Sequence, residues 1–376
     1  MAAERRILFV VGTRPEAVKL APLVLVFQQQ QGWDVRVCAT AQHRQMLDST
    51  LGFFGITPHY DLDLMRPGQD ITSLTANVVQ AMAPVLDDHR PDLVIVQGDT
   101  TTVFAAALAA FYRKIRVAHV EAGLRSGDRY SPFPEEMNRL LTSRLTDLHL
   151  APTQRAAHNL HAEAIHGHVH VTGNTVIDAL HWVSAKIEAE PALASGLAEL
   201  EAMFADKRII GVTSHRRENF GEGMEQIAQA IREIAARPDT AVIFPVHLNP
   251  NVRKVMNERL SGLSNVALIE PLDYPHFARL LNIAEIMLTD SGGVQEEAPA
   301  LGKPVLVMRE TTERPEGVEA GTARLVGTDA LRIVTEISTL LDDTAAYEAM
   351  ARAHNPFGDG HSACRIVELL AHEIGH

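Results

Sequence analysis

The stretch VIVQGDTTTVFAAALAAF, residues 94–111, contains the pattern that decides the fold. An apolar run ends at Gly98 and Asp99, and three threonines then lead into a nearly all-apolar helical segment. A strand that is apolar on both faces and is followed at once by a helix is typical of a parallel sheet covered by helices. The stretch therefore predicts an α/β protein and raises the question of what a carboxylate does at the end of such a strand.

Similar units occur along most of the chain, in two series that a polar stretch rich in Ala and Glu separates at residues 184–208. Two such series predict two Rossmann-like domains, with ligands bound outside the carboxyl ends of the strands. A helical pattern at residues 15–30 is interrupted by Pro22. The strands are expected at 6–11, 34–39, 92–97, 116–121, 147–152 and 168–173, and then at 208–214, 241–247, 265–271, 285–290, 303–308 and 323–327.

Composition excludes several classes of partner for these 376 residues. Apolar residues make up 46% and charged residues 22% of the chain, and the net charge is −13. This charge disfavours nucleic acid and anionic membranes. The two cysteines, Cys38 and Cys364, favour reduced thiols in a cytoplasmic protein. The apolar run near the N-terminus is too short for a signal peptide, and residues 103–111 are too few to span a bilayer.

Positive charge follows the first expected strand, in GTRPEAVK at residues 12–19. Gly12 permits a tight turn, and Arg14 and Lys19 place cationic groups near a helix start, which suits a phosphate or pyrophosphate. An ordinary strand-to-helix turn is the alternative.

Acidic residues follow two further strands, at Asp99 and Glu121, and a proline-rich loop places Glu135 and Glu136 before another helix. Acids that converge at one sheet edge are suited to general acid–base catalysis. Asp99 could instead cap the next helix. Glu136 could simply pair with Arg139 along its helix.

The second series has polar groups at the same positions. His215, Arg216 and Arg217 follow its first strand, and TDSGGVQEEAPALGKP, residues 289–304, opens a helix at Ser291, Gly292 and Gly293. Backbone N–H groups there can meet a phosphate, Glu296 or Glu297 can accept from ribose hydroxyls, and Arg314 adds charge. Together these residues predict a bound nucleoside diphosphate.

Five histidines lie in HNLHAEAIHGHVHV, at 158, 161, 166, 168 and 170. Alternation places the last three on one face of a strand, which resembles a metal site. Without a cysteine or clear carboxylate partner, however, we expect surface histidines and no metal.

Long motifs in this chain resemble the non-hydrolysing UDP-N-acetylglucosamine 2-epimerases, from about Ile7 to the last helix. They include FVVGTRPEAVKLAPLV, VQGDTTTVFAAALAAFY, VAHVEAGLRSGDRYSPFPEEMNR and LTDSGGVQEEAPALGKPVLVMRETTERPEGVEAGT. The resemblance implies a GT-B fold with two Rossmann-like domains facing a central cleft. It places residues 1–172 in the first domain, which the C-terminal helix 356–376 completes, and residues 173–355 in the second, UDP-binding domain.

The resemblance implies reversible conversion of UDP-GlcNAc to UDP-ManNAc without a cofactor, by elimination of UDP to a 2-acetamidoglucal and re-addition. It also implies a homodimer. A hydrolysing epimerase that releases ManNAc and UDP, a glycosyltransferase of the same fold and a UDP-sugar sensor without turnover are the alternatives. Residue by residue, catalytic roles fall on Asp99, Glu121, Glu135 and His215, and further substrate contacts fall on Arg14, Lys19, Phe277, Ser291, Gly292, Gly293, Glu297 and Arg314.

Some bacterial relatives bind a second UDP-GlcNAc as an allosteric effector. The matching positions here are Gln42, Gln45, Glu135, Arg216 and His247. The chain departs from the family twice. Gly68 stands before Gln69 where such relatives have Arg, with Arg66 as a substitute, and Leu272 stands where some relatives carry Gln at a uracil contact.

Overall fold

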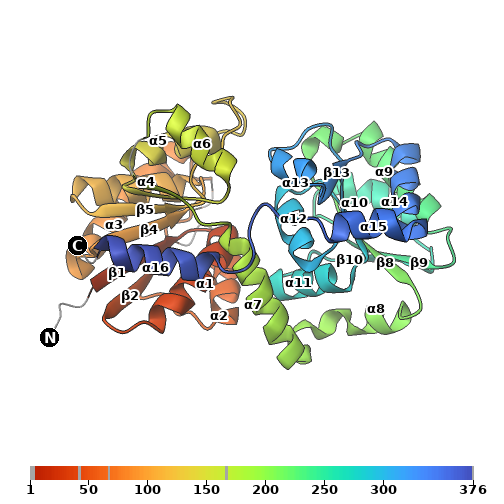
Figure 1. The fold of residues 1–376 in the computed structure, drawn as a ribbon, viewed down its shortest axis with the longest axis horizontal. Coiled ribbons are helices and arrows are strands. Elements are labelled where there is room, and N and C mark those ends of the chain that lie inside the picture. The colour runs from red at the N-terminus through yellow and green to blue at the C-terminus, as the bar shows by residue number, and fades with distance from the viewer. Residues whose placement is uncertain (1–4, 41–43, 67, 166–167, 375–376) are drawn as a thin grey trace. The chain divides into compact units, whose positions relative to one another are not determined.

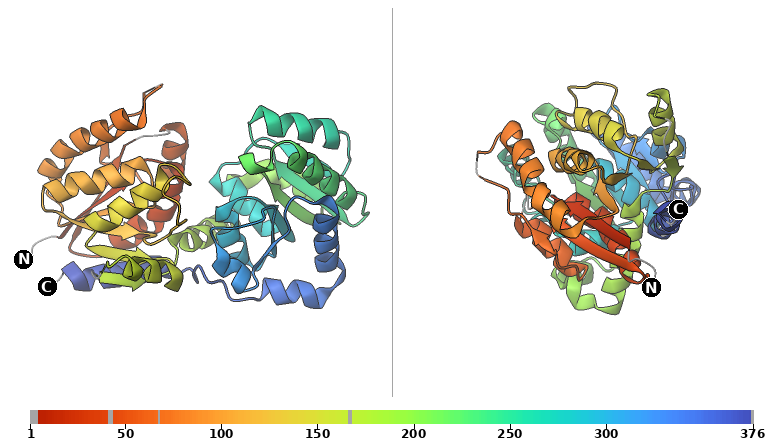
Figure 2. Two further views of the ribbon diagram at one scale, coloured as in Figure 1. Left: turned by 90° about the horizontal axis from the view of Figure 1, so that it is seen from above. Right: turned by 90° about the vertical axis from the view of Figure 1, so that its left-hand side faces the viewer.

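The computed structural model describes residues 5–40, 44–66, 68–165 and 168–374. The chain forms two compact units, one made of residues 1–179 and 357–376 and the other of residues 180–356. Each unit contains one parallel β-sheet with helices on both faces (Figures 1 and 2). The predicted α/β class with two Rossmann-like domains is therefore confirmed.

The first unit contains a seven-stranded sheet in the order β3-β2-β1-β4-β5-β6-β7. Its strands are β1 (Arg5–Val11), β2 (Trp33–Ala39), β3 (Tyr60–Asp61), β4 (Leu93–Gln97), β5 (Arg116–Val120), β6 (Leu148–Ala151) and β7 (His168–Val171). Its helices are α1 (Arg14–Gln28), α2 (Arg44–Phe53), α3 (Ile71–His89), α4 (Thr101–Tyr112), α5 (Glu135–Leu145), α6 (Gln154–Ala162), the start of α7 (Thr175–Ala189) and α16 (Ser362–Ile374).

The second unit contains a six-stranded sheet in the order β10-β9-β8-β11-β12-β13. Its strands are β8 (Arg208–Thr213), β9 (Thr240–Pro245), β10 (Val266–Ile269), β11 (Ile286–Thr289), β12 (Val305–Val307) and β13 (Ala323–Leu325). Its helices are α8 (Ala198–Met203), α9 (Glu222–Ile234), α10 (Pro250–Leu260), α11 (Tyr274–Ile283), α12 (Gly292–Glu297), α13 (Pro315–Glu319), α14 (Ala330–Asp342) and α15 (Thr344–Ala351), with 3-10 turns η1 (Pro191–Leu197), η2 (Arg217–Asn219) and η3 (Ala298–Leu301).

The strand pattern follows from burial on both faces. Leu8, Val94 and Val96 pack against α3 and α4, and in the second unit Ile210 and Val212 pack against α9 and α14. Burying such side chains stabilises the fold by about 1.5–3 kcal/mol each. Every predicted strand is present, whereas the two-residue strand β3 carries too few apolar residues to be recognised from the sequence. The expected interruption at Pro22 is wrong, because α1 continues through this buried proline.

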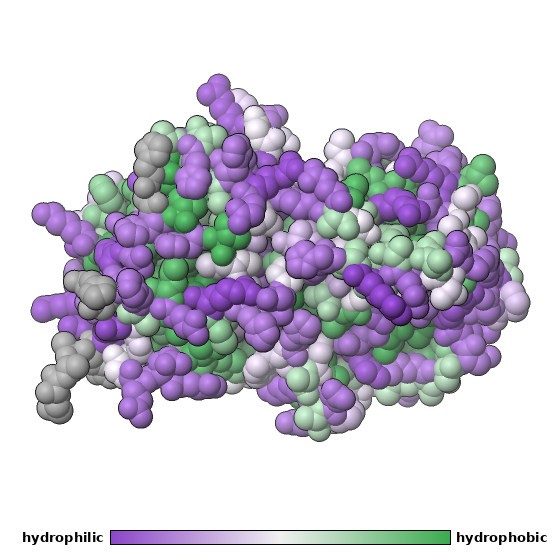
Figure 3. Space-filling model, viewed as in Figure 1, coloured by the Kyte–Doolittle hydropathy of each residue, from purple (hydrophilic) through white to green (hydrophobic). Residues whose placement is uncertain are grey.

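The face of the molecule drawn in Figure 3 is mostly hydrophilic, with smaller apolar patches between charged residues. Among the described residues, no helix combines the length and apolar character that a membrane span requires.

Candidate active site

The strand order of each sheet marks where a ligand is expected. In the first sheet β1 lies between β2 and β4, and in the second β8 lies between β9 and β11, so successive connections leave in opposite directions at these points. Open α/β sheets bind ligands at such switch points, outside the carboxyl ends of the strands. The β1 and β4 ends lead to Gly12 and Asp99, and the β8 and β11 ends lead to His215 and Ser291. The predicted site residues thus follow the strands that flank both switch points.

Gly12 allows the loop after β1 to lie close to its neighbours. A Cβ atom at this position would lie 2.6 Å from Oγ1 of Thr102 and 2.8 Å from Oγ1 of Thr40, so only glycine fits. Arg14 begins α1 and is half-buried, with no hydrogen bond or ion pair to another described residue. Lys19, on the same helix, turns toward the end of β5.

Glu121 lies at the centre of a buried polar cluster. Its Oε1 accepts a hydrogen bond of 2.6 Å from Nζ of Lys19 and one of 3.3 Å from Asn174, and its Oε2 accepts from Gln97. Its φ of +64° is uncommon for a residue with a side chain, and backbone of this kind concentrates at functional sites. The strained turn after β5 therefore holds this carboxylate in a fixed position.

Asp99 does not cap α4. Thr100 is the N-cap, and its hydroxyl accepts from the backbone N–H of Val103. The Asp99 carboxylate instead forms an ion pair of 2.6 Å with Arg139. Arg139 also pairs with Glu136 at 2.9 Å, as the helix spacing predicts. The capping interpretation of Asp99 is therefore wrong, because the helix begins one residue later than that interpretation requires.

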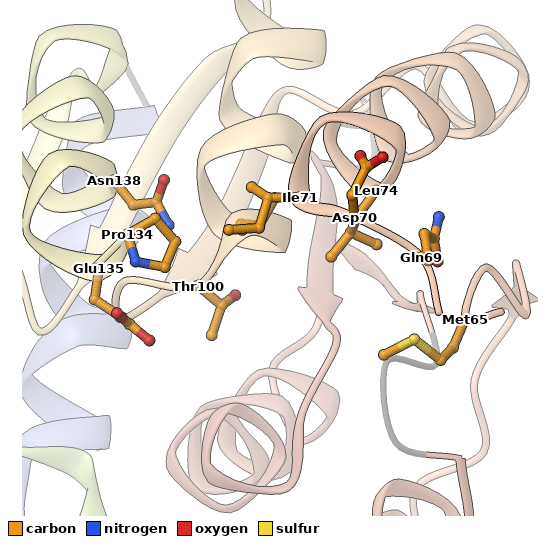
Figure 4. A pocket seen from close by; sticks show the side chains of 10 residues that line it. Met65, Gln69, Asp70, Ile71, Leu74, Thr100, Pro134, Glu135 and Asn138 are labelled. Atoms are coloured by element: carbon orange, nitrogen blue, oxygen red, sulfur yellow. The ribbon is translucent and has the colours of Figure 1, made fainter. Parts of the chain in front are cut away.

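Glu136 and Glu135 are neighbours with different environments. The buried Glu136 accepts hydrogen bonds from the backbone N–H groups of Ser126 and Gly127 and thereby holds that loop. Glu135 is half-buried and lines a cavity of about 240 Å³, which Thr100 and Gln69 also line. Figure 4 shows Glu135 on the α5 side of this cavity and residues from the start of α3 on the other.

Glu16 is a buried acid that strand-end reasoning missed. Its carboxylate accepts from the backbone N–H of Gly12 at 2.6 Å and from the hydroxyls of Thr13 and Thr100 at 2.9 and 2.8 Å. It thus joins the loop after β1 to the loop after β4. Burial raises the pKa of Glu16 to about 7, although the three hydrogen bonds act in the opposite direction. The motif GTRPE contains this residue, but the sequence does not show that its side chain turns inward.

The second unit positions His215 with a fully buried carboxylate, Asp290. The backbone N–H groups of His215 and Arg216 donate to Asp290 at 2.9 and 3.0 Å, and Nδ1 of His215 lies 3.2 Å from its Oδ1. Burial lowers the pKa of His215, while the Asp290 charge acts against that change. The ring of His247 stacks on His215 with centroids 5.7 Å apart. His215 is therefore oriented from two sides. Sequence reasoning did not single out Asp290, the last residue of the expected strand at 285–290, because the sequence does not show that its carboxylate accepts hydrogen bonds from the loop after β8.

Arg314 lies over the start of α12. A Cβ at Gly292 would be 3.3 Å from its guanidinium carbon, and Glu296 pairs with it at 2.8 Å. Of the two acids predicted for ribose, Glu296 thus engages Arg314, and Glu297 lies buried beside Gly293. Ser291 donates its backbone N–H to Thr289. Cationic and backbone donors of this kind suit an anionic ligand.

The described members of the remaining predicted residues occupy core, loop and surface positions. Phe277 and Leu272 are partly buried and pack on the core beneath α11. Arg216 approaches Glu313 at 3.9 Å. Arg66 is mostly exposed and donates to the carbonyl of Asp63. Gln42 and His166 lie outside the described residues, as does the side chain of Gln45, which is in the first turn of α2.

The two units thus supply different kinds of functional group. The first unit brings Lys19 to Glu121, places Asp99 against Arg139, and adds Glu135 at a nearby cavity. Carboxylates held in fixed positions can transfer protons at defined positions. The second unit supplies an oriented imidazole and an arginine over a glycine-rich loop. That combination can bind a phosphate group and protonate a leaving oxygen.

Comparison with known proteins identifies relatives over nearly the full chain. The family model for UDP-N-acetylglucosamine 2-epimerase matches residues 26–371. A UDP-N-acetylglucosamine 2-epimerase of Salmonella typhimurium is 54% identical, over 97% of this chain and 98% of its own. The crystal structure of a UDP-GlcNAc 2-epimerase from Neisseria meningitidis bound to UDP-GlcNAc is 48% identical with a TM-score of 0.89, covering 98% of this chain and 100% of its own. An S. aureus structure with UDP is 43% identical with a TM-score of 0.88, covering 99% of this chain and 97% of its own.

Proposed function

The chain belongs to the UDP-N-acetylglucosamine 2-epimerase family, and on that premise we propose that it interconverts UDP-GlcNAc and UDP-ManNAc by inverting C2. The fold is of the GT-B type expected for that family. The observation that carries the proposal is the set of carboxylates that follow β4 and β5, in which Glu121 has a strained backbone and is hydrogen-bonded on both oxygens. A protein that only bound a UDP sugar would not need such groups.

The chemistry explains the need for acids. The hydrogen on C2 is not next to a carbonyl, so simple deprotonation is too difficult. Elimination breaks the C1–O bond to UDP and removes the C2 proton, which leaves a 2-acetamidoglucal. Re-addition of UDP at C1 with protonation of the opposite face of C2 then gives the other epimer. Elimination needs a base and re-addition needs an acid. A positioned acid–base group typically accelerates such a proton-transfer step by about 10²–10⁴-fold.

We assign the proton transfers at C2 to the carboxylates of the first unit. Glu121, Asp99 and Glu135 are the candidates, with Lys19 and Arg139 as their charged partners. Glu16 joins the two loops that carry these groups and is a positioning residue in this scheme.

We assign stabilisation of the departing UDP to the second unit. His215, held by Asp290, would donate to the leaving phosphate oxygen, and Arg314 with the backbone of Ser291, Gly292 and Gly293 would bind the diphosphate. Stabilising charge where it develops commonly contributes more to catalysis than any other effect. Glu297 would accept from ribose and Phe277 would contact uracil. Arg14 would supply a further cation from the first unit.

The experiment that tests this function is incubation with UDP-GlcNAc without added NAD or metal, followed by NMR of the products. UDP-ManNAc should accumulate to an equilibrium mixture, and the same mixture should form from UDP-ManNAc. Accumulation of free ManNAc with UDP would identify the hydrolysing alternative. Binding of UDP-GlcNAc without turnover would identify the sensor.

We further propose a cytoplasmic homodimer whose product supplies ManNAc units for surface polysaccharide. UDP sugars are made and used inside the cell, and both cysteines are free thiols, which supports that location. Phe111 and Tyr112, adjacent at the end of α4, are 55% and 65% exposed and supply an apolar surface for a second copy. Light scattering of the purified chain measures its mass directly.

We also propose that a second UDP-GlcNAc regulates the enzyme through Gln42, Gln45, Glu135, Arg216 and His247. Two contacts support the proposal. Glu135 lines the cavity of Figure 4 together with Gln69, and His247 stacks on His215. An effector that touched these residues would therefore act directly beside groups assigned to the reaction. Binding that favours one state of the protein shifts the population toward that state.

A further inference from the structure

The outer edge of the first sheet brings two imidazoles and a carboxylate together. β7 is the edge strand, and His168 and His170 occupy alternate positions on it, so both side chains lie on one face. Their rings stack with centroids 6.4 Å apart. Glu373, in the last turn of α16, places its Oε1 3.1 Å from Nδ1 of His168 and 3.9 Å from Nε2 of His170. β7 and α16 are about two hundred residues apart in the sequence, and the Glu373 carboxylate brings them into contact.

The spacing of these atoms is close to that of a metal site. One ligand atom from each of the three residues lies within 4.8 Å of the other two. Ligands about 2.0–2.1 Å from a tetrahedral zinc ion lie roughly 3.3 Å from one another. The side chain of His168 is 53% exposed, so its ring can rotate by the small amount that closes the set.

A second observation concerns the ring of His170. Nε2 of His170 is buried from solvent and has no hydrogen-bond partner among the described residues. Leaving a buried polar atom without a partner is energetically unfavourable. A metal ion at this position would satisfy that nitrogen.

Arg116 orients the carboxylate from the other side. Its Nη1 donates to the backbone carbonyl of Glu373 at 3.1 Å, and its Nη2 lies 3.9 Å from Oε2. Oε1 is thereby directed at the two histidines. Groups that hold a ligand from behind in this way are a regular feature of metal sites.

We propose that His168, His170 and Glu373 bind one divalent transition-metal ion of the zinc class. Two neutral imidazoles and one carboxylate suit Zn²⁺, Ni²⁺ or Cu²⁺, whereas Mg²⁺ and Ca²⁺ require oxygen ligands. Three protein ligands leave a fourth position for water. The ion would join the C-terminal helix α16 to the edge strand β7, and Figure 1 shows α16 running along the first unit. The site is separate from the residues assigned to epimerisation.

The test is Zn²⁺ binding to the metal-stripped full chain, measured by titration calorimetry. The wild-type chain should bind one more equivalent of Zn²⁺ than His168→Gln, His170→Gln or Glu373→Gln, or bind it at least about tenfold more tightly. The matched control is His161→Gln, an exposed histidine on α6, which should bind as the wild type does. Mg²⁺ at the same concentration should not bind at this site.

A second measurement follows amide hydrogen exchange in helix α16. Zn²⁺ should slow amide hydrogen exchange in residues 362–374 of the wild-type chain and should leave exchange in His168→Gln unchanged. Epimerase activity of His168→Gln without metal should equal that of the wild type, which shows that the variant is folded. Equal Zn²⁺ affinity in wild type and all three ligand variants would overturn the proposal, as would absence of Zn²⁺ binding to the wild type.

Discussion

Nζ of Lys19 lies 2.6 Å from Oε1 of Glu121, although one residue belongs to the chain's first helix and the other follows its fifth strand. Both side chains are mostly buried, at 15% and 5% exposed. Removing one member of a buried pair leaves the other charge uncompensated. Lys19 therefore fixes Glu121, in addition to the substrate contact that the family resemblance implies for it.

The first prediction concerns this pair. We expect Lys19→Met and Glu121→Gln each to lower kcat by at least about 100-fold. Glu121→Gln removes the proton-transferring carboxylate, and Lys19→Met removes the ammonium group that holds this carboxylate in position. The double variant should be only slightly slower than the slower single variant, because residues that act as a unit are not additive. The measurement is kcat for all four chains at saturating UDP-GlcNAc. Losses that multiply in the double variant would show that the two residues act independently.

The second prediction concerns Asp99. Because Thr100 caps the helix, Asp99→Asn should leave the helix start intact and should lower kcat by at least about 100-fold. UDP affinity should change little, since the groups assigned to the diphosphate lie mainly in other segments. The matched control is Asp92→Asn, which changes an exposed acid at the opposite end of the same strand and should retain activity.

Thermal unfolding separates this interpretation from a structural role for Asp99. A variant that unfolds at a lower temperature but turns over normally per folded molecule would show that the Asp99–Arg139 ion pair serves stability alone.

The third prediction concerns pH and Glu16. Burial raises the pKa of this carboxyl from 4.5 to about 7, so the folded chain binds its proton more tightly than the unfolded chain does. The contribution of Glu16 to stability is therefore most favourable below pH 4.5. It declines as pH rises toward 7 and is constant above that. The whole change amounts to about 3 kcal/mol.

Comparison with Glu16→Gln isolates this titration. Unfolding by urea at pH 5, 6, 7 and 8 can be followed through Trp33, which packs on Phe27 in the first unit, in a Trp182→Phe background. The free energy of unfolding of the Glu16 chain, minus that of the glutamine variant, should fall across this range. A difference that stays constant with pH would mean that Glu16 keeps its ordinary pKa.

The fourth prediction concerns regulation. We expect a sigmoidal dependence of rate on UDP-GlcNAc, and a lag in the reverse reaction from pure UDP-ManNAc that a trace of UDP-GlcNAc removes. Gln69→Ala, which alters a residue that lines the cavity of Figure 4, should reduce the sigmoidicity. Hyperbolic forward kinetics, together with immediate turnover of purified UDP-ManNAc, would show that the chain lacks the effector site.

Sequence patterns predicted the fold well because burial on both faces of a parallel strand leaves an unmistakable apolar run. They also placed Asp99, Glu121 and His215 at strand ends, since a strand's end is visible where the apolar run stops. The direction of a side chain within a helix is not visible in this way. Glu16 turns inward to Gly12 and Thr100, and Glu373 meets a strand about two hundred residues away. The sequence also does not fix the exact residue at which a helix begins. Asp99 and Thr100 both suit an N-cap, and the structure shows that Thr100 is the cap.

Incubation of the enzyme with UDP-GlcNAc in D₂O tests the central claim most directly. Elimination removes the C2 proton and re-addition delivers one from the protein's solvent-exchanged acids, so NMR should show deuterium at C2 of both UDP-GlcNAc and UDP-ManNAc. The Asp99→Asn chain should incorporate deuterium correspondingly slowly. Conversion to UDP-ManNAc with the original hydrogen retained at C2 would contradict both the elimination mechanism and proton transfer by the carboxylates of the first unit.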